Sequence, residues 1–121
     1  MRLSFTLPLP PTSNHRLIPA KGSGRLITSP KMREWKKEAE DTLFRQRDWG
    51  NPTITGRVAV TLVITWPDRR KRDIDGPVKP VLDALVKAGI LKDDSLIKEL
   101  AVIVEDEIGD GVVGIEIDII D

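Results

Sequence analysis

The stretch RVAVTLVITWPDRRKRDIDGPVKPVLDALVKAGILKDD, residues 57–94, contains the most informative succession of patterns in the chain. Its first ten residues, 57–66, are β-branched and almost continuously apolar, which predicts a central strand buried on both faces. Four consecutive cations then run into two aspartates, and residues 77–88 predict a helix. The stretch therefore predicts a strand, a loop, a helix and an acidic loop, in that order.

The predicted helix has a regular apolar stripe. Four residues recur at the i, i+3, i+4 and i+7 spacing of one helix face: Val78, Val81, Leu82 and Leu85. Gly76 is expected as the N-cap, Pro77 as the first helical residue and Gly89 as the C-terminal stop. One face of this helix is thus expected to pack on the core.

Near the N-terminus, apolar and polar residues alternate over residues 3–7, which predicts a short strand that stops at Pro8. Residues 19–29 predict a flexible loop. Ser29 is a plausible N-cap for a helix over residues 30–47, with proline at the first helical position. The apolar stripe of this helix comprises Met32, Trp35, Ala39, Thr42 and Leu43. We expect Trp35 to be a core anchor rather than a platform for stacking bases.

Toward the C-terminus, a strand is expected around residues 100–104, a turn at 109–111 and a closing strand over 112–120. The closing strand alternates apolar and acidic residues, which predicts one buried face and one wet face. The element order predicts an α+β (α/β-like) fold: a single domain spanning 1–121, with a mixed sheet of about four strands packed with two main helices.

Composition excludes several classes of protein. The 121 residues include no cysteine and one histidine, which excludes disulfides, thiolate metal sites and a histidine-rich zinc site. No apolar run approaches the roughly 20 residues of a membrane span, and the N-terminus lacks the apolar core of a signal peptide. A cytoplasmic protein without membrane contact is therefore expected.

The net charge is zero, but the charges are unevenly distributed along the chain. Residues 1–72 contain 15 Lys and Arg against 6 Asp and Glu, whereas residues 73–121 contain 4 against 13. Either the fold mixes the two halves into a neutral surface, or the run Arg69, Arg70, Lys71, Arg72 forms a basic patch. Such a patch commonly contacts phosphates.

The acidic residues of the stretch suggest a metal site. Asp73 and Asp75 would leave an extended backbone on the same face, and Asp93 and Asp94 follow the helix. Clustered carboxylates repel one another unless a cation binds them, and hard oxygen ligands favour Mg²⁺ or Mn²⁺. A phosphodiester is the expected substrate beside a basic patch. The alternative is that the two aspartates only form a turn or a helix cap.

Lys79 is open to two interpretations. It falls four residues after Asp75, in the first helical turn, where it could stabilise charge developing on a phosphate or orient a water. Alternatively, Lys79 is a solvated helix lysine paired with Asp83 at i+4, an interaction of only a few tenths of a kcal/mol.

Two segments carry a resemblance to a known family. PDRRKRDIDGPVKPVLDALVKAGILKDDSLI, residues 67–97, closely resembles the signature of the RusA family of Holliday-junction resolvases, and TLPLPPTSNHR, residues 6–16, resembles that family's opening motif. The resemblance covers essentially the whole chain. It implies a Mg²⁺-dependent endonuclease, of a kind found in bacteria and prophages, that acts in DNA recombination and repair. The implied assembly is a homodimer that nicks two strands of a four-way junction symmetrically.

The resemblance also implies roles for single residues. Asp73, Asp75 and Asp94 match the metal ligands, and Lys79 matches the helix lysine, while Asp93 is a less certain participant and Asp83 a supporting one. The residues expected to contact the DNA backbone are Arg16, Lys21, Arg25, Arg69, Arg70, Lys71 and Arg72, with His15 as a turn or DNA-contact residue. Gly76 departs from the family pattern, which often has Asn directly after the second aspartate.

Two other classes of function are compatible with the residues. A non-catalytic nucleic-acid-binding protein would use only the basic half of the chain. A hydrolase of small phosphorylated molecules would use the acidic cluster, although the run of four cations exceeds what such a substrate needs. Cleavage of a four-way junction in the presence of Mg²⁺ would separate these alternatives from the nuclease.

Overall fold

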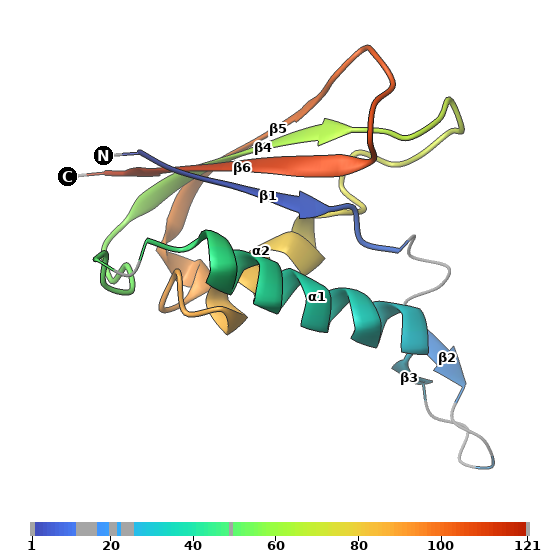
Figure 1. Ribbon diagram of the computed structural model, residues 1–121, viewed down its shortest axis with the longest axis horizontal. Coiled ribbons are helices and arrows are strands. Elements are labelled where there is room, and N and C mark those ends of the chain that lie inside the picture. Colours follow the sequence, from blue (N-terminus) through green and yellow to red (C-terminus); the bar gives the residue numbers. More distant parts are fainter. Residues whose placement is uncertain (1, 12–16, 20–21, 23–25, 49, 121) are drawn as a thin grey trace.

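The computed structural model describes residues 2–11, 17–19, 22, 26–48 and 50–120. Within these residues the main sheet has four strands in the order β1-β6-β4-β5. Their bounds are β1 Arg2–Pro8, β4 Val58–Thr65, β5 Ile97–Val104 and β6 Val112–Ile119. The helices α1 (Pro30–Gln46) and α2 (Val78–Lys87) both lie on one side of this sheet (Figure 1). The prediction of an α+β domain with a mixed four-stranded sheet and two main helices is therefore confirmed.

The sheet topology places α2 in a crossover connection. β4 pairs antiparallel with β6 and parallel with β5. Parallel neighbours cannot be joined by a tight turn, so the chain leaves the end of β4, returns through α2 and enters β5 from the opposite end. The loops before and after α2 contain the three predicted metal ligands, Asp73, Asp75 and Asp94.

Strand β4 is central, as predicted, but only one of its faces is fully covered. Its core-facing side chains, each at most 1% exposed, are Val58, Val60, Leu62 and Ile64. The alternate residues between them are half-buried. The prediction of burial on both faces was wrong because both helices pack on the same side, leaving the other face of the sheet without a helix (Figure 1).

Helix α1 begins and packs as its sequence predicts. The Ser29 Oγ accepts a hydrogen bond from the Met32 N–H at 3.1 Å, which caps the first turn. Trp35 is 5% exposed, and its Nε1 donates to the Pro8 carbonyl at 2.9 Å. At the other end, the Gln46 side-chain amide bonds both backbone groups of Thr6. Trp35 is therefore a core anchor, and α1 is tied to β1 at both of its ends.

Helix α2 begins one residue later than predicted. Val78 is its first residue, and Pro77 occupies the N-cap position without a side-chain cap, so the expectation of Gly76 as N-cap was wrong. The chain enters the helix through a turn in which the Asp75 carbonyl accepts from the Val78 N–H. The predicted stop is confirmed, since Gly89 follows the helix with φ +76°, a conformation that favours glycine.

Strand pairing adds structure that the apolar pattern alone did not predict. β2 (Leu17–Pro19) and β3 (Leu26–Thr28) pair antiparallel, and β3 lies within residues 19–29, where a flexible loop was expected. β5 begins at Ile97 rather than near residue 100, because the partly buried Ile97 and the polar, exposed Glu99 both pair with β4. A single 3₁₀ turn, η2 (Asp94–Leu96), precedes it. No helix among the described residues is long and apolar enough to cross a membrane.

Candidate active site

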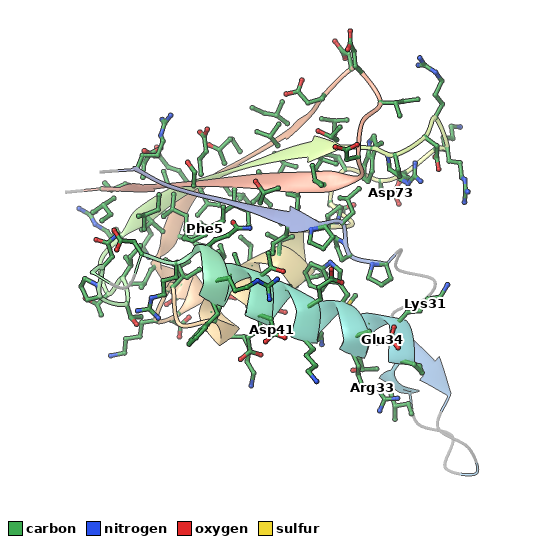
Figure 2. The ribbon with its side chains drawn as sticks, in the orientation of Figure 1. Phe5, Lys31, Arg33, Glu34, Asp41 and Asp73 are labelled. Atoms are coloured by element: carbon green, nitrogen blue, oxygen red, sulfur yellow. The ribbon has the colours of Figure 1, made fainter. Side chains whose placement is uncertain are left out.

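The loop between β4 and α2 is anchored where it leaves the sheet. The Trp66 carbonyl accepts a hydrogen bond from the Gly109 N–H at 3.0 Å, in the connection between β5 and β6. In that connection Gly111 has φ +71°, and a Cβ added there would meet the Pro67 Cβ at 3.1 Å. Figure 2 shows Asp73 beyond the end of β4. The first residues of the loop are thus fixed against the β5–β6 connection, and the aspartates follow further along the loop.

Asp73 and Asp75 lie in a turn rather than at the end of a strand. The Asp73 carbonyl accepts from the Gly76 N–H at 3.2 Å, and the Asp75 carbonyl accepts from the Val78 N–H at 3.1 Å. Both aspartates are exposed. The predicted turn therefore exists, and it presents two carboxylates to solvent directly before α2.

The four cations before Asp73 differ in their surroundings. The Arg72 guanidinium donates to Asp68 Oδ1 at 2.7 Å and lies over the Trp66 ring, 5.2 Å from its centroid. Its side chain is only 16% exposed, whereas that of Arg70, which also pairs with Asp68, is 81% exposed. Arg72 therefore belongs to the internal structure of the loop.

Asp68 is a structural residue that the sequence reasoning missed. The hydrogen bond from the Arg72 side chain, followed by the one from the Arg70 N–H, lowers the pKa of Asp68 to about 2 from its usual 3.8. Asp68 precedes Arg72 by four residues, and this spacing was the signal available in the sequence. The exposed cations that are left for a ligand are Arg69, Arg70 and Lys71.

Lys79 pairs with one aspartate of its own helix and with one aspartate beyond that helix. Its Nζ lies 2.8 Å from Asp94 Oδ2 and 3.0 Å from Asp83 Oδ1. The hydrogen bond to Asp94, and then the one to Asp83, raises the pKa of Lys79. The pairing with Asp83 is therefore present as one alternative predicted, and the second contact brings Asp94 to the first turn of α2, the same end of the helix as Asp75.

Asp93 and Asp94 have different environments although they are adjacent. Asp93 Oδ1 accepts from the Ser95 N–H at 2.8 Å and caps η2, and this backbone hydrogen bond lowers the pKa of Asp93. The Asp94 side chain is 41% exposed and faces Lys79. Asp93 thus has a local structural role, while Asp94 is available to an incoming ligand at the cost of its ion pair.

The predicted metal ligands are not assembled into one group in this conformation. Among the described residues, no three His, Cys, Asp or Glu side chains are grouped so that they could hold a metal ion. The donor chemistry suits Mg²⁺, because Asp73, Asp75 and Asp94 offer only carboxylate oxygens. The cation that Asp94 contacts here is the Lys79 ammonium. The remaining predicted site residues, Arg16, Lys21 and Arg25 together with His15, lie outside the described residues.

The chain is similar to known proteins over nearly its full length. Residues 8–120 match the family model described as "Endodeoxyribonuclease RusA". Crossover junction endodeoxyribonuclease RusA of Aquifex aeolicus is 35% identical over 92 residues, covering 76% of this chain and 71% of that protein. The protein of the same name from Enterobacteria phage HK97 is 32% identical over 113 residues, covering 93% and 91% of the two chains. We conclude that the chain belongs to the RusA family of endodeoxyribonucleases.

Proposed function

We propose that the chain is a Mg²⁺-dependent, structure-selective endodeoxyribonuclease that resolves Holliday junctions by paired symmetric nicks. Its membership in the RusA family and the names of its two relatives support junction DNA as the substrate. The observation that carries the proposal is the exposed turn with Asp73 and Asp75, which lies one residue beyond the exposed cations Arg69, Arg70 and Lys71 of the β4–α2 loop. Metal ligands and phosphate contacts are adjacent there.

The basic residues of this loop have separate roles in the proposal. Arg69, Arg70 and Lys71 contact the phosphodiester backbone, because they are exposed and adjoin the aspartate turn. Arg16, Lys21 and Arg25 provide further backbone contacts. Arg72 does not contact DNA in this proposal, since its guanidinium is bound to Asp68 and covered by Trp66.

The acidic residues hold the metal in the proposal. Asp73 and Asp75 bind Mg²⁺, or Mn²⁺ in its place, with Asp94 as a third ligand. The bound ion supplies polarisation of the scissile phosphate and a water of lowered pKa. Lys79, in the first turn of α2 beside this site, provides a cation to the charge that develops on the phosphate.

The assembly in the proposal is a homodimer. A four-way junction has two strands to be cut symmetrically, and one chain contains one set of the aspartates. An isologous dimer presents two identical sites related by a two-fold axis, and it is the commonest assembly of soluble proteins. The expected result in analytical ultracentrifugation is sedimentation as a dimer, and a monomer that still makes paired nicks would contradict this part of the proposal.

The test of the function is a synthetic four-way junction incubated with the purified protein, with and without Mg²⁺. Paired symmetric nicks are expected only with the metal, and a linear duplex of the same sequence is expected to stay intact. Asp73→Asn is expected to reduce cleavage at least about a hundredfold, since metal chemistry supplies several kcal/mol of transition-state stabilisation, while junction affinity in Ca²⁺ is unchanged.

A matched control is Asp106→Asn, which removes an exposed aspartate from the connection between β5 and β6. It is expected to retain full cleavage. Failure of the wild-type protein to cut the junction with Mg²⁺ or Mn²⁺ would contradict the proposed activity and favour a protein that only binds nucleic acid.

A further inference from the structure

One ammonium group sits between two carboxylates at the start of α2. Lys79 Nζ contacts Asp94 at 2.8 Å and Asp83 at 3.0 Å, and the three side chains are 69%, 41% and 52% exposed in the order Lys79, Asp94, Asp83. Asp83 lies on the same helix as Lys79, one turn further on, whereas Asp94 belongs to the separate turn η2. Lys79 is thus shared between a permanent neighbour and a residue proposed to bind metal.

We propose that Lys79 is an exchangeable cation at Asp94: in the metal-free protein its ammonium binds Asp94, and a divalent ion binding there displaces Lys79 onto Asp83 alone. The inference rests on the proposed metal site and deepens it. Asp83 is then a positioning residue, which retains the displaced lysine beside the site.

The exchange follows from electrostatics and from the geometry of the lysine. An ammonium and a divalent cation repel each other, so the binding of either one at a half-exposed carboxylate weakens the binding of the other. An ammonium has three N–H donors on a flexible stem and keeps a bond to Asp83 when it leaves Asp94. Lys79 therefore does not have to move into bulk solvent when the ion binds.

Asp94 does not need Lys79 to keep its place in the fold. The side chain of Asp93 caps η2, and the Leu96 N–H donates to the Asp93 carbonyl at 3.3 Å. The turn also packs against α2. Removal of the Lys79 ammonium is therefore expected to leave Asp94 in position and to free its carboxylate for the ion.

The test is Mn²⁺ binding to the DNA-free protein, measured by titration of the free-ion signal in electron paramagnetic resonance. Lys79→Met is expected to raise the Mn²⁺ affinity roughly two- to fivefold, the range that a partly exposed ion pair supplies. Asp83→Asn is expected to lower the affinity, because the ammonium then binds Asp94 alone, and in the Lys79→Met background the same change is expected to have little effect.

Lys87→Met is the matched control, since Lys87 is an exposed lysine near the other end of the same helix. It is expected to leave the Mn²⁺ affinity unchanged. An unchanged or lowered affinity in Lys79→Met, or an equal rise in Lys87→Met, would overturn the exchange.

Asp94→Asn separates failure of the exchange from failure of the proposed metal site. If Asp94→Asn weakens Mn²⁺ binding and Lys79→Met does not alter it, only the exchange is wrong. If Asp94→Asn leaves Mn²⁺ binding unchanged, Asp94 is not a ligand, and both the third ligand of the proposed site and the exchange are overturned.

Discussion

Arg69 and Arg72 illustrate how neighbouring cations of one run can differ in role. Arg72 is held against Asp68 and Trp66, whereas Arg69 is exposed. Arg72→Gln is expected to lower the free energy of unfolding, with the lost stacking on Trp66 alone costing about 0.5–1 kcal/mol. Arg69→Gln is expected to leave stability unchanged and to reduce the slope of log binding constant against log salt by about one, because one phosphate contact is lost.

The stability of both variants is measured by urea denaturation. The salt slope of both variants is measured from junction binding at several salt concentrations. Each variant thus serves as the control for the other. A smaller salt slope in Arg72→Gln at unchanged stability would mean that this arginine contacts DNA after all, as the run of four cations first suggests.

Asp68 is expected to give the protein an acid-sensitive contribution to stability. Its pKa is about 2 in the folded chain against the usual 3.8, so the folded state favours the ionised form. This contribution is complete above about pH 4 and is lost as the pH falls toward 2. The difference in melting temperature between the wild type and Asp68→Asn should therefore shrink over that interval. A difference independent of pH would show that the Arg72 hydrogen bond is not its source.

At single residues, the sequence indicated which side chains bear chemistry but not what they contact. Lys79 was predicted in the first turn of a helix and lies there, whereas Asp73 and Asp75 were expected on an extended backbone, with a turn as the alternative, and they lie in the turn. The sequence did not show which cations of the run 69–72 are exposed and which one is half-buried, because this depends on how Trp66 and Asp68 pack against Arg72. The assignment of metal ligands and DNA contacts remains a prediction.

Among the elements, helix α2 owes part of its stability to the glycine that follows its last turn. Gly89 has φ +76° and directs the chain toward Leu91 and then Asp94. Gly89→Ala is expected to destabilise the protein by about 1–2 kcal/mol, the cost of a left-handed conformation for a residue with a Cβ. Because this turn leads to η2, the variant is also expected to weaken the proposed metal binding.

Gly56→Ala is the matched control, because Gly56 does not have a positive φ and a Cβ added there has no neighbour within 4 Å. It is expected to leave stability unchanged or to raise it by up to about 1 kcal/mol, through lower entropy of the unfolded chain. Equal losses in the two variants, measured by urea denaturation, would contradict the role assigned to the end of α2.

The helices were more predictable than the strands, for a physical reason. A helix contains its own hydrogen bonds, so the cap at Ser29 and the stop at Gly89 could be read locally. The first residues of β5 and the pairing of β2 with β3 depend instead on a partner strand elsewhere in the chain. Likewise, a uniformly apolar strand such as β4 does not reveal that only one of its faces is covered.

At the scale of the whole molecule, the described residues form one contiguous core, in which both helices contact the same face of the sheet. Leu62 lies in the central strand and is fully buried. Leu62→Ala is expected to cost about 2–5 kcal/mol. Since the core is shared, circular dichroism and tryptophan fluorescence should report the same shifted transition. Two separate transitions would indicate that the helices and the sheet unfold independently.

The distribution of charge in the fold differs from its distribution along the chain. The basic loop of residues 69–72 starts beside the acidic connection between β5 and β6, because Trp66 bonds Gly109 and Pro67 packs on Gly111. The sequence predicted a sign change at Arg72 and Asp73, but not that the basic loop starts beside an acidic connection. The sequence also could not show whether Asp94 lies close to Asp73 and Asp75, since this depends on whether Lys79 or a metal ion binds Asp94.

The stacking of Arg72 on Trp66 makes the loop optically visible. A cation held over an indole ring alters the electric field at the ring, so a rearrangement that separates Arg72 from Trp66 is expected to shift the emission wavelength of Trp66. Trp35, a buried residue of α1, serves as an internal reference in the same protein. The chain thus contains its own fluorophore for following, in stopped-flow mixing, when the loop responds to a junction and when it responds to an ion.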